Sequence, residues 1–161
     1  MTLPAAISYA SRGWRVLLLW WILPDGSCAC GASDCGNKGK HPQPEACPKG
    51  CHSATTDAAI ITEWLTKWPS ANIGIATGQE SGIWVLDVDP RHGGHVTLED
   101  LEPTHGKLPT SIRAKTGSGG EHVLWKHPGD GRLSNSAGRL GAGLDVRADG
   151  GYIVAAPSNH A

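Results

Sequence analysis

Two aspartates placed two positions apart are the residues of this sequence best suited to hold a metal ion. Asp87 and Asp89 lie at the end of an apolar run, residues 83–88, that favours a β-strand. Side chains two apart on a strand point to the same face, and two carboxylates on one face repel each other unless a cation lies between them. Their oxygens suit Mg²⁺ or Mn²⁺. The alternative is a turn-capping aspartate at the strand end, before Pro90.

A glycine-rich stretch, residues 116–121, lies between two predicted strands and ends at His122. Its glycines allow a close backbone approach and can offer N–H groups to phosphate oxygens, which makes Gly119 and Gly120 candidate binding positions. His122 can donate to a phosphate at the start of the next strand. A plain hairpin turn and a structural histidine are the alternatives.

Asp145 is the best third carboxylate. It lies between two apolar residues in a strand-like segment, residues 144–147. A two-metal site needs about three carboxylates to hold ions roughly 3.5–4 Å apart. Asp145 is therefore either a metal ligand or a salt-bridge partner of Arg147 or Arg139.

Three cysteines and one histidine fall within fourteen residues of a glycine-rich segment. Four such ligands suit a tetrahedral structural Zn²⁺, and the set is Cys28, Cys30, Cys35 and His41. Cys47, Cys51 or His52 can replace one of them, or Cys47 and Cys51 can form a separate pair. A disulfide set fits poorly with an odd count of five cysteines, and free thiols remain open. We expect Lys38, Lys40 and Lys49 on this segment to be solvated, and contact with nucleic-acid phosphates is the alternative.

The elements that must position these groups follow a mixed α and β order, with strands dominating the second half. The patterns predict helices over 3–12, over 57–68 behind an Asp57 N-cap, and over 97–101. They predict strands over 14–22, 72–76, 83–88, 111–115, 122–126, 144–147 and 152–155. Residues 24–53 show no periodicity.

Composition excludes several classes. The chain has 161 residues, 39% hydrophobic and 18% charged, which favours one folded domain over disorder. Its net charge of -1 gives no global attraction to DNA or membrane. The longest apolar run, residues 16–23, is shorter than the ~20 residues a membrane span needs. Together with the lack of a signal-peptide pattern, this predicts a cytoplasmic protein.

The three motifs together resemble the archaeo-eukaryotic primase superfamily, and most closely its bifunctional DNA primase/polymerase (prim-pol) branch. The motifs are residues 86–89, 117–122 and 144–147, and flanking segments 54–57, 68–74, 135–138 and 156–158 agree. The resemblance implies an α+β fold, a primase-type palm with an RRM-like mixed sheet, an N-terminal α/β part and the Cys/His-rich insertion over 24–53. It also implies one catalytic domain over 1–161, truncated at its C-terminal end, because relatives continue past the region of residues 157–160.

The resemblance further implies template-directed nucleotidyl transfer by two Mg²⁺ or Mn²⁺ ions, in the replication of a plasmid, phage or mobile element. Asp87, Asp89 and Asp145 would hold the ions, and His122 would contact the phosphates of the incoming nucleotide. Ser118 and Arg147 would be secondary contacts. The partners would be a single-stranded DNA template, NTPs or dNTPs, and a fused or separate helicase.

Two other functions fit the same residues. One is a catalytically inactive nucleic-acid-binding replication module, which would be marked by a broken acidic triad, whereas all three acids are present here. The other is a metal-dependent nuclease, for which His92 and His95 lie close enough in the sequence to add ligands.

Overall fold

The computed structural model describes residues 1–159. The expected C-terminal truncation depends partly on the last two residues, which lie outside the described part. Each half of the fold is built around an antiparallel sheet. The helical elements are α1 (Thr2–Ser11), η1 (Gly50–Ser53), α2 (Ala58–Lys67), η2 (Pro90–His92) and α3 (Gly94–His105). The strands are β1 (Val16–Leu19), β2 (Asn72–Ala76), β3 (Ile83–Val88), β4 (Ile112–Lys115), β5 (Glu121–Lys126), β6 (Ser136–Ala137), β7 (Leu144–Arg147) and β8 (Tyr152–Ala155).

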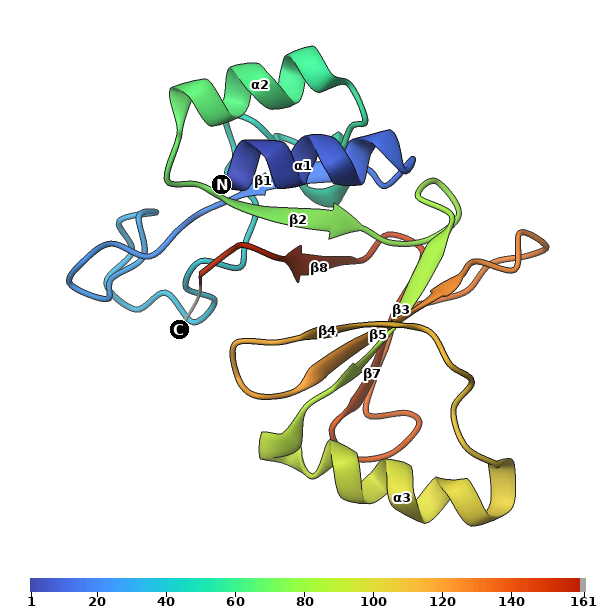
Figure 1. Cartoon of the computed structure of the whole chain (residues 1–161). Helices are drawn as coiled ribbons and strands as arrows, with labels where there is room; N and C mark the ends of the chain where they lie inside the picture. Colours follow the sequence, from blue (N-terminus) through green and yellow to red (C-terminus); the bar gives the residue numbers. More distant parts are fainter. Residues whose placement is uncertain (160–161) are drawn as a thin grey trace.

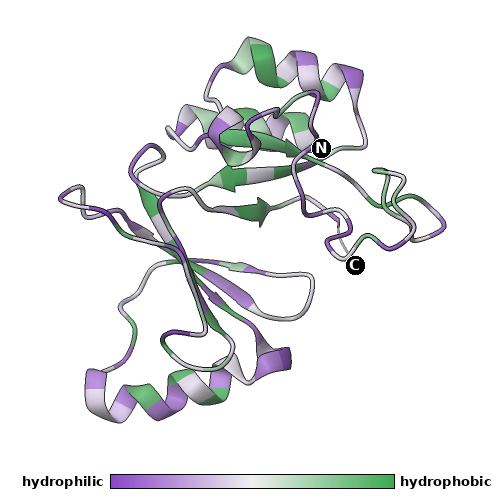
Figure 2. Ribbon diagram, turned by 180° about the vertical axis from the view of Figure 1, so that it is seen from behind, coloured by the Kyte–Doolittle hydropathy of each residue, from purple (hydrophilic) through white to green (hydrophobic). Residues whose placement is uncertain are grey.

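The first sheet has the order β1-β2-β8 and carries α1 and α2 on one side (Figure 1). Every residue of β1 and β2 is buried, including the polar Asn72 at the start of β2. Figure 2 shows these strands mostly in the hydrophobic colour. Asp57 caps α2, because its carboxylate accepts hydrogen bonds from the N–H groups of Ala59 and Ile60. Strand β8 joins this sheet although it comes last in the chain.

The second sheet has the order β4-β5-β3-β7-β6, and α3 covers one of its faces. Leu98 and Leu101 of α3 pack on Leu86, Val88 and their neighbours on β5 and β7. Trp84 and Trp125 face each other across β3 and β5, with ring centroids 4.8 Å apart. On the opposite face, Val85 and Leu124 are buried in the core of the first half, and the polar pair Asp87 and His122 follows two residues further along β3.

The structure corrects four sequence predictions. The sheet is not mixed, because all pairings between named strands are antiparallel. The predicted helix over 97–101 is longer, since tertiary packing extends α3 back to Gly94 and through Pro103. The first strand is shorter than 14–22, and β6 was not predicted.

No helix among the described residues is long and apolar enough to cross a membrane.

Candidate active site

Three predicted site residues stand side by side across three neighbouring strands. Asp87 on β3 is the register partner of His122 on β5 and, on its other side, of Asp145 on β7. Directly opposed residues in an antiparallel sheet have Cβ atoms about 4.5–5.5 Å apart. The His122 Nε2 lies 3.7 Å from the Asp87 Oδ1. This row of side chains, Asp145, Asp87 and His122, lies on the face of the sheet that α3 leaves open.

Asp89 lies one residue beyond β3, and both of its carboxylate oxygens are already engaged. Its Oδ1 accepts hydrogen bonds from the backbone N–H of Arg91 at 3.0 Å and from the Arg91 Nε at 3.1 Å. Its Oδ2 lies 2.9 Å from the Arg91 Nη2 and 3.0 Å from the His92 Nδ1. The side-chain hydrogen bonds from Arg91 hold the pKa of Asp89 well below its usual range. The turn-capping alternative therefore holds for Asp89, beside any role with a metal ion.

An arginine also balances the negative charge of Asp145, at the other end of the row. The Arg147 Nη2 lies 2.8 Å from the Asp145 Oδ2, so the salt-bridge alternative for Asp145 holds in the structure, with Arg147 as its partner. Burial raises the pKa of Asp87, and the neighbouring carboxylates of Asp145 and Asp89 raise it further, against the opposing charges of Arg147 and Lys40. Asp87 is thus the carboxylate whose negative charge most needs a cation.

The row faces a cavity of about 750 Å³ between the two sheets. This size falls in the range of about 300–1,000 Å³ that is usual for small-molecule sites. Asp87, Asp89, Asp145, His122, Ser118 and Arg147 all line it, as do the middle residues of β8. Gly119 and Gly120, which we expected to bind phosphate, do not line it.

Gly120 instead packs against the end of β3. A Cβ on Gly120 would lie 2.3 Å from the carbonyl oxygen of Val88, between the two aspartates of the motif. Its N–H donates to the Thr116 Oγ1 at 3.0 Å, and Thr116 in turn contacts the Ser118 hydroxyl at 3.1 Å. The glycine turn therefore packs its backbone closely against the strand end that carries Asp87 and Asp89, while Thr116 and Ser118 of the same stretch reach the cavity.

Sequence reasoning missed other residues of the cavity wall. They are polar or aromatic and come from segments distant in the sequence: Asn37, Lys40, Thr116, Asn135 and Tyr152. Lys40 was expected to be solvated, yet it lines the cavity and lies close enough to Asp87 to influence that carboxyl group. The position of Lys40 next to His41, a predicted zinc ligand, was a reason to consider it, but the sequence alone does not place it in the cavity.

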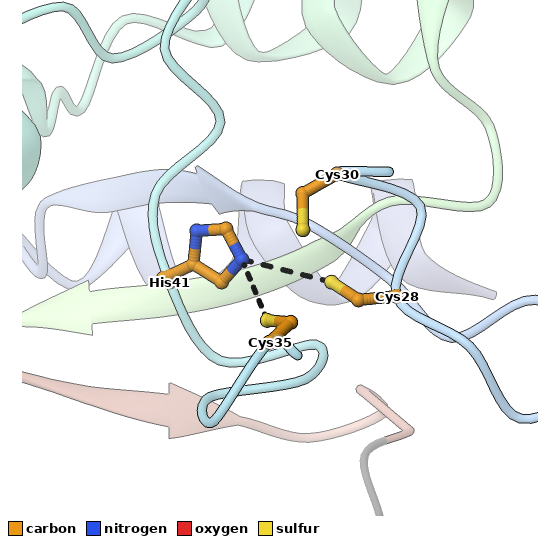
Figure 3. Close-up of side chains that lie close together, drawn as sticks. All are labelled: Cys28, Cys30, Cys35 and His41. Carbon is orange, nitrogen blue, oxygen red and sulfur yellow. Dashed lines mark hydrogen bonds between the residues drawn. The ribbon is translucent and has the colours of Figure 1, made fainter. Parts of the chain in front are cut away.

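The predicted zinc ligands meet at one point. The side chains of Cys28, Cys30, Cys35 and His41 point toward one another (Figure 3), and their ligand atoms all lie within 4.8 Å of one another. The His41 Nε2 is 3.6 Å from the Cys28 Sγ and 3.5 Å from the Cys35 Sγ. Tetrahedral bonds of ~2.3 Å to sulfur and ~2.0–2.1 Å to nitrogen separate these two kinds of ligand by about 3.5–3.6 Å. This Cys₃His cluster can therefore hold zinc.

The chemistry of the donors agrees with the geometry. Burial opposes the Cys28 thiolate, but hydrogen bonds from the N–H groups of Cys30 and Gly39 and from the side chains of Cys30 and His41 outweigh it and lower the pKa of Cys28 to about 6. A thiolate, not a thiol, is the zinc ligand. Cys47 and Cys51 do not belong to the cluster: Cys47 is buried against the Leu18 N–H, and the Cys51 thiol donates to the Gly150 carbonyl.

The three aspartates differ from this cluster. Among residues 1–159, only the Cys₃His cluster brings its ligand atoms together within 4.8 Å. Ligands shared between two ions that are roughly 3.5–4 Å apart are spread more widely than the ligands of one ion. Of the two histidines that could add metal ligands in a nuclease, His92 lines the cavity beside Asp89, whereas His95 does not line it.

The row therefore shares one cavity with the arginine side chain of Arg147 and the hydroxyl of Ser118, groups that can contact an anionic ligand. The sequence comparison identifies the family. Residues 6–161 match the bifunctional DNA primase/polymerase N-terminal (Prim-Pol) family, and the chain belongs to it. Membership implies a nucleotidyltransferase-type enzyme with DNA and nucleotides as substrates. A search of curated proteins gave no match.

Proposed function

We propose that this domain is a template-directed DNA primase/polymerase that joins (d)NTPs by two-metal catalysis, with the five-stranded sheet as its palm. The observation that carries the proposal is the row of Asp145, Asp87 and His122 across β7, β3 and β5, on the wall of one cavity. Family membership supplies the reaction class, and the row supplies side chains of the right chemistry in one place.

In this proposal Asp87, Asp89 and Asp145 hold Mg²⁺ or Mn²⁺. Bound ions would lower the pKa of the attacking 3′-hydroxyl and stabilise charge on the leaving pyrophosphate. His122 donates to the phosphates of the nucleotide from the neighbouring strand, and its Nε2 lies 3.7 Å from the Asp87 Oδ1. Ser118 and Arg147 border the same space. No side-chain nucleophile is required, because positioning and charge stabilisation account for such a reaction.

A template assay tests the function. The protein is incubated with labelled single-stranded DNA, with and without an annealed primer, together with Mn²⁺ or Mg²⁺ and nucleotides. Lengthened products are expected from the wild type and from the control Asp100→Asn, an exposed acid on α3. The double variant Asp87→Asn/Asp145→Asn should give none.

Other outcomes separate the rival functions. Shortened DNA would indicate a nuclease instead of a polymerase. His92, which lies beside Asp89, would then be the first residue to substitute. A gel shift with no change in DNA length would indicate a catalytically inactive DNA-binding module. Extension at the wild-type rate by the double aspartate variant would show that the row is not the catalytic site.

We also propose that the Cys₃His cluster holds one structural zinc ion. Protein purified without chelators is expected to contain about one equivalent of zinc, and Cys35→Ser should lose it. Cys51→Ser is the matched control, because this thiol donates a hydrogen bond to the Gly150 carbonyl that a serine hydroxyl can also donate. Wild-type protein well below one equivalent, or an equal zinc content in both variants, would contradict the assignment.

A further inference from the structure

The loop between two of the zinc ligands forms part of the cavity wall. Residues 36–40 connect Cys35 to His41, and both Asn37 and Lys40 of this loop line the cavity that contains the carboxylate row. The carboxylates come from the five-stranded sheet, whereas this loop lies against the three-stranded sheet. The two therefore approach the cavity from different halves of the fold.

The backbone around Lys40 is fixed by hydrogen bonds from three strands or their ends. The Tyr152 hydroxyl on β8 donates to the Lys40 carbonyl at 3.0 Å. The buried Asn72 side chain on β2 donates to the Gly39 carbonyl at 2.8 Å. The N–H of Trp20, just after β1, donates to the His41 carbonyl at 3.0 Å. The Cα of Lys40 is therefore held in place with respect to the first sheet.

The ammonium group of Lys40 is available for a ligand. Within residues 1–159, no hydrogen bond and no carboxylate within 4.0 Å engages it, in contrast to the guanidinium groups of Arg91 and Arg147. Its charge nevertheless acts on Asp87 across the cavity. A flexible lysine side chain on a fixed backbone is a point charge suited to phosphate oxygens.

We propose that Lys40 binds the triphosphate of the incoming nucleotide from the wall opposite the carboxylate row, and that metal binding at the Cys₃His cluster holds it there. This inference rests on the proposed polymerase function. The cluster brackets the loop at Cys35 and His41, so a bound ion would fix both ends of the loop in addition to the hydrogen bonds that hold residues 39–41. A metal ion at the Cys₃His cluster would thus contribute to nucleotide binding through the position of Lys40.

Calorimetric titration of the full chain with dATP in the presence of Mg²⁺, without template or primer, tests this inference. Lys40→Ala should raise the dissociation constant for dATP by about tenfold, the loss of one charge-assisted contact. Lys40→Arg should retain most of the affinity. Lys38→Ala is the matched control, because Lys38 is half-buried like Lys40 and lies on the same loop, but contacts the Gly26 carbonyl and does not line the cavity.

Two further measurements make the result specific. Affinity for dAMP should be the same in wild type and Lys40→Ala, because dAMP lacks the β- and γ-phosphates. Cys35→Ser, with its zinc content measured in parallel, should weaken dATP binding at least as much as Lys40→Ala. Zinc content and melting temperature of Lys40→Ala should equal those of the wild type.

Several results would overturn the inference. One is a dATP affinity of Lys40→Ala equal to that of Lys38→Ala, and another is a weakened affinity for single-stranded DNA with unchanged dATP binding. If the wild type extends primers in these cases, the inference fails and the proposed function stands. If the wild type neither binds dATP nor extends a primer, the proposed function fails and this inference with it.

Discussion

Gly120→Ala should disable the active site through one backbone clash. The added Cβ would lie 2.3 Å from the Val88 carbonyl oxygen, and real Cβ contacts are essentially never under 3.0 Å, so the turn and the strand must separate by at least 0.7 Å. Val88 lies between Asp87 and Asp89, so the displacement falls on the two carboxylates. Misplacement by about 1 Å can cost an enzyme roughly 10²-fold in rate. We expect kcat/KM for primer extension to fall by roughly 10- to 100-fold.

The neighbouring Gly119→Ala is the control. Gly119 has φ +82°, and a Cβ there would meet nothing within 4 Å. The control therefore carries the strain of a left-handed alanine, roughly 1–2 kcal/mol, without moving β3. Primer-extension kinetics and thermal melting of both variants separate the two effects. If Gly120→Ala keeps kcat/KM within threefold of Gly119→Ala, the close packing of the turn on β3 does not position the carboxylates.

Three other substitutions test separate parts of the structure. Asp87→Asn should raise the melting temperature in EDTA at neutral pH and remove activity. Because the pKa of Asp87 is raised in the folded protein, the wild type loses stability as the pH rises through that pKa. Melting curves between about pH 3 and 8 should show this loss only in the wild type. Arg91→Ala should lower the Mn²⁺ concentration that half-saturates the site by no more than about fivefold, since exposed ion pairs are weak; calorimetry with an unchanged midpoint would refute competition between Arg91 and the metal. Asp57→Ala should cost about 1 kcal/mol in chemical denaturation, the usual value of a helix N-cap, with primer extension unaffected.

Local signals in the sequence predicted local structure well. The Asp57 cap, the helix behind it and the strands over 72–76 and 83–88 all have the predicted bounds to within a residue. Each depends on contacts between residues near in sequence, such as the hydrogen bond from the Ala59 N–H to Asp57 at 2.8 Å. Helix α3 was underestimated, because glycines and Pro103 disfavour it locally and its packing through Leu98 and Leu101 becomes apparent only in the fold.

The content of the candidate site was predicted better than its arrangement. Alternation along one strand places Asp87 and Asp89 on one face, but it says nothing about which residue of the next strand lies opposite. A shift of one residue in register would have turned His122 and Asp145 to the other face. Their alignment with Asp87 depends on pairings between residues 35 and 58 positions apart.

Lys40 could not be placed from sequence for the same reason. Its position depends on the Tyr152 hydroxyl, 112 residues away, and on the Asn72 side chain. Lys38, two residues earlier and also half-buried, contacts the Gly26 carbonyl and does not line the cavity. The difference between the two lysines arises from the tertiary contacts of residues 39–41, which no local pattern encodes.

The side chains around Asp87 and Asp89 balance the negative charge of the two carboxylates unequally. Two same-face carboxylates need a cation, and in this structure arginines supply the charge: Arg91 at Asp89 and Arg147 at Asp145. Asp87, between them in the row, has no arginine bound to it within residues 1–159 and is the carboxylate whose pKa is raised. A divalent ion at Asp87 can therefore bind without displacing an arginine, whereas one at Asp89 must compete with Arg91 and His92. The two ions of the proposed mechanism should accordingly bind with unequal affinity, the tighter one at Asp87.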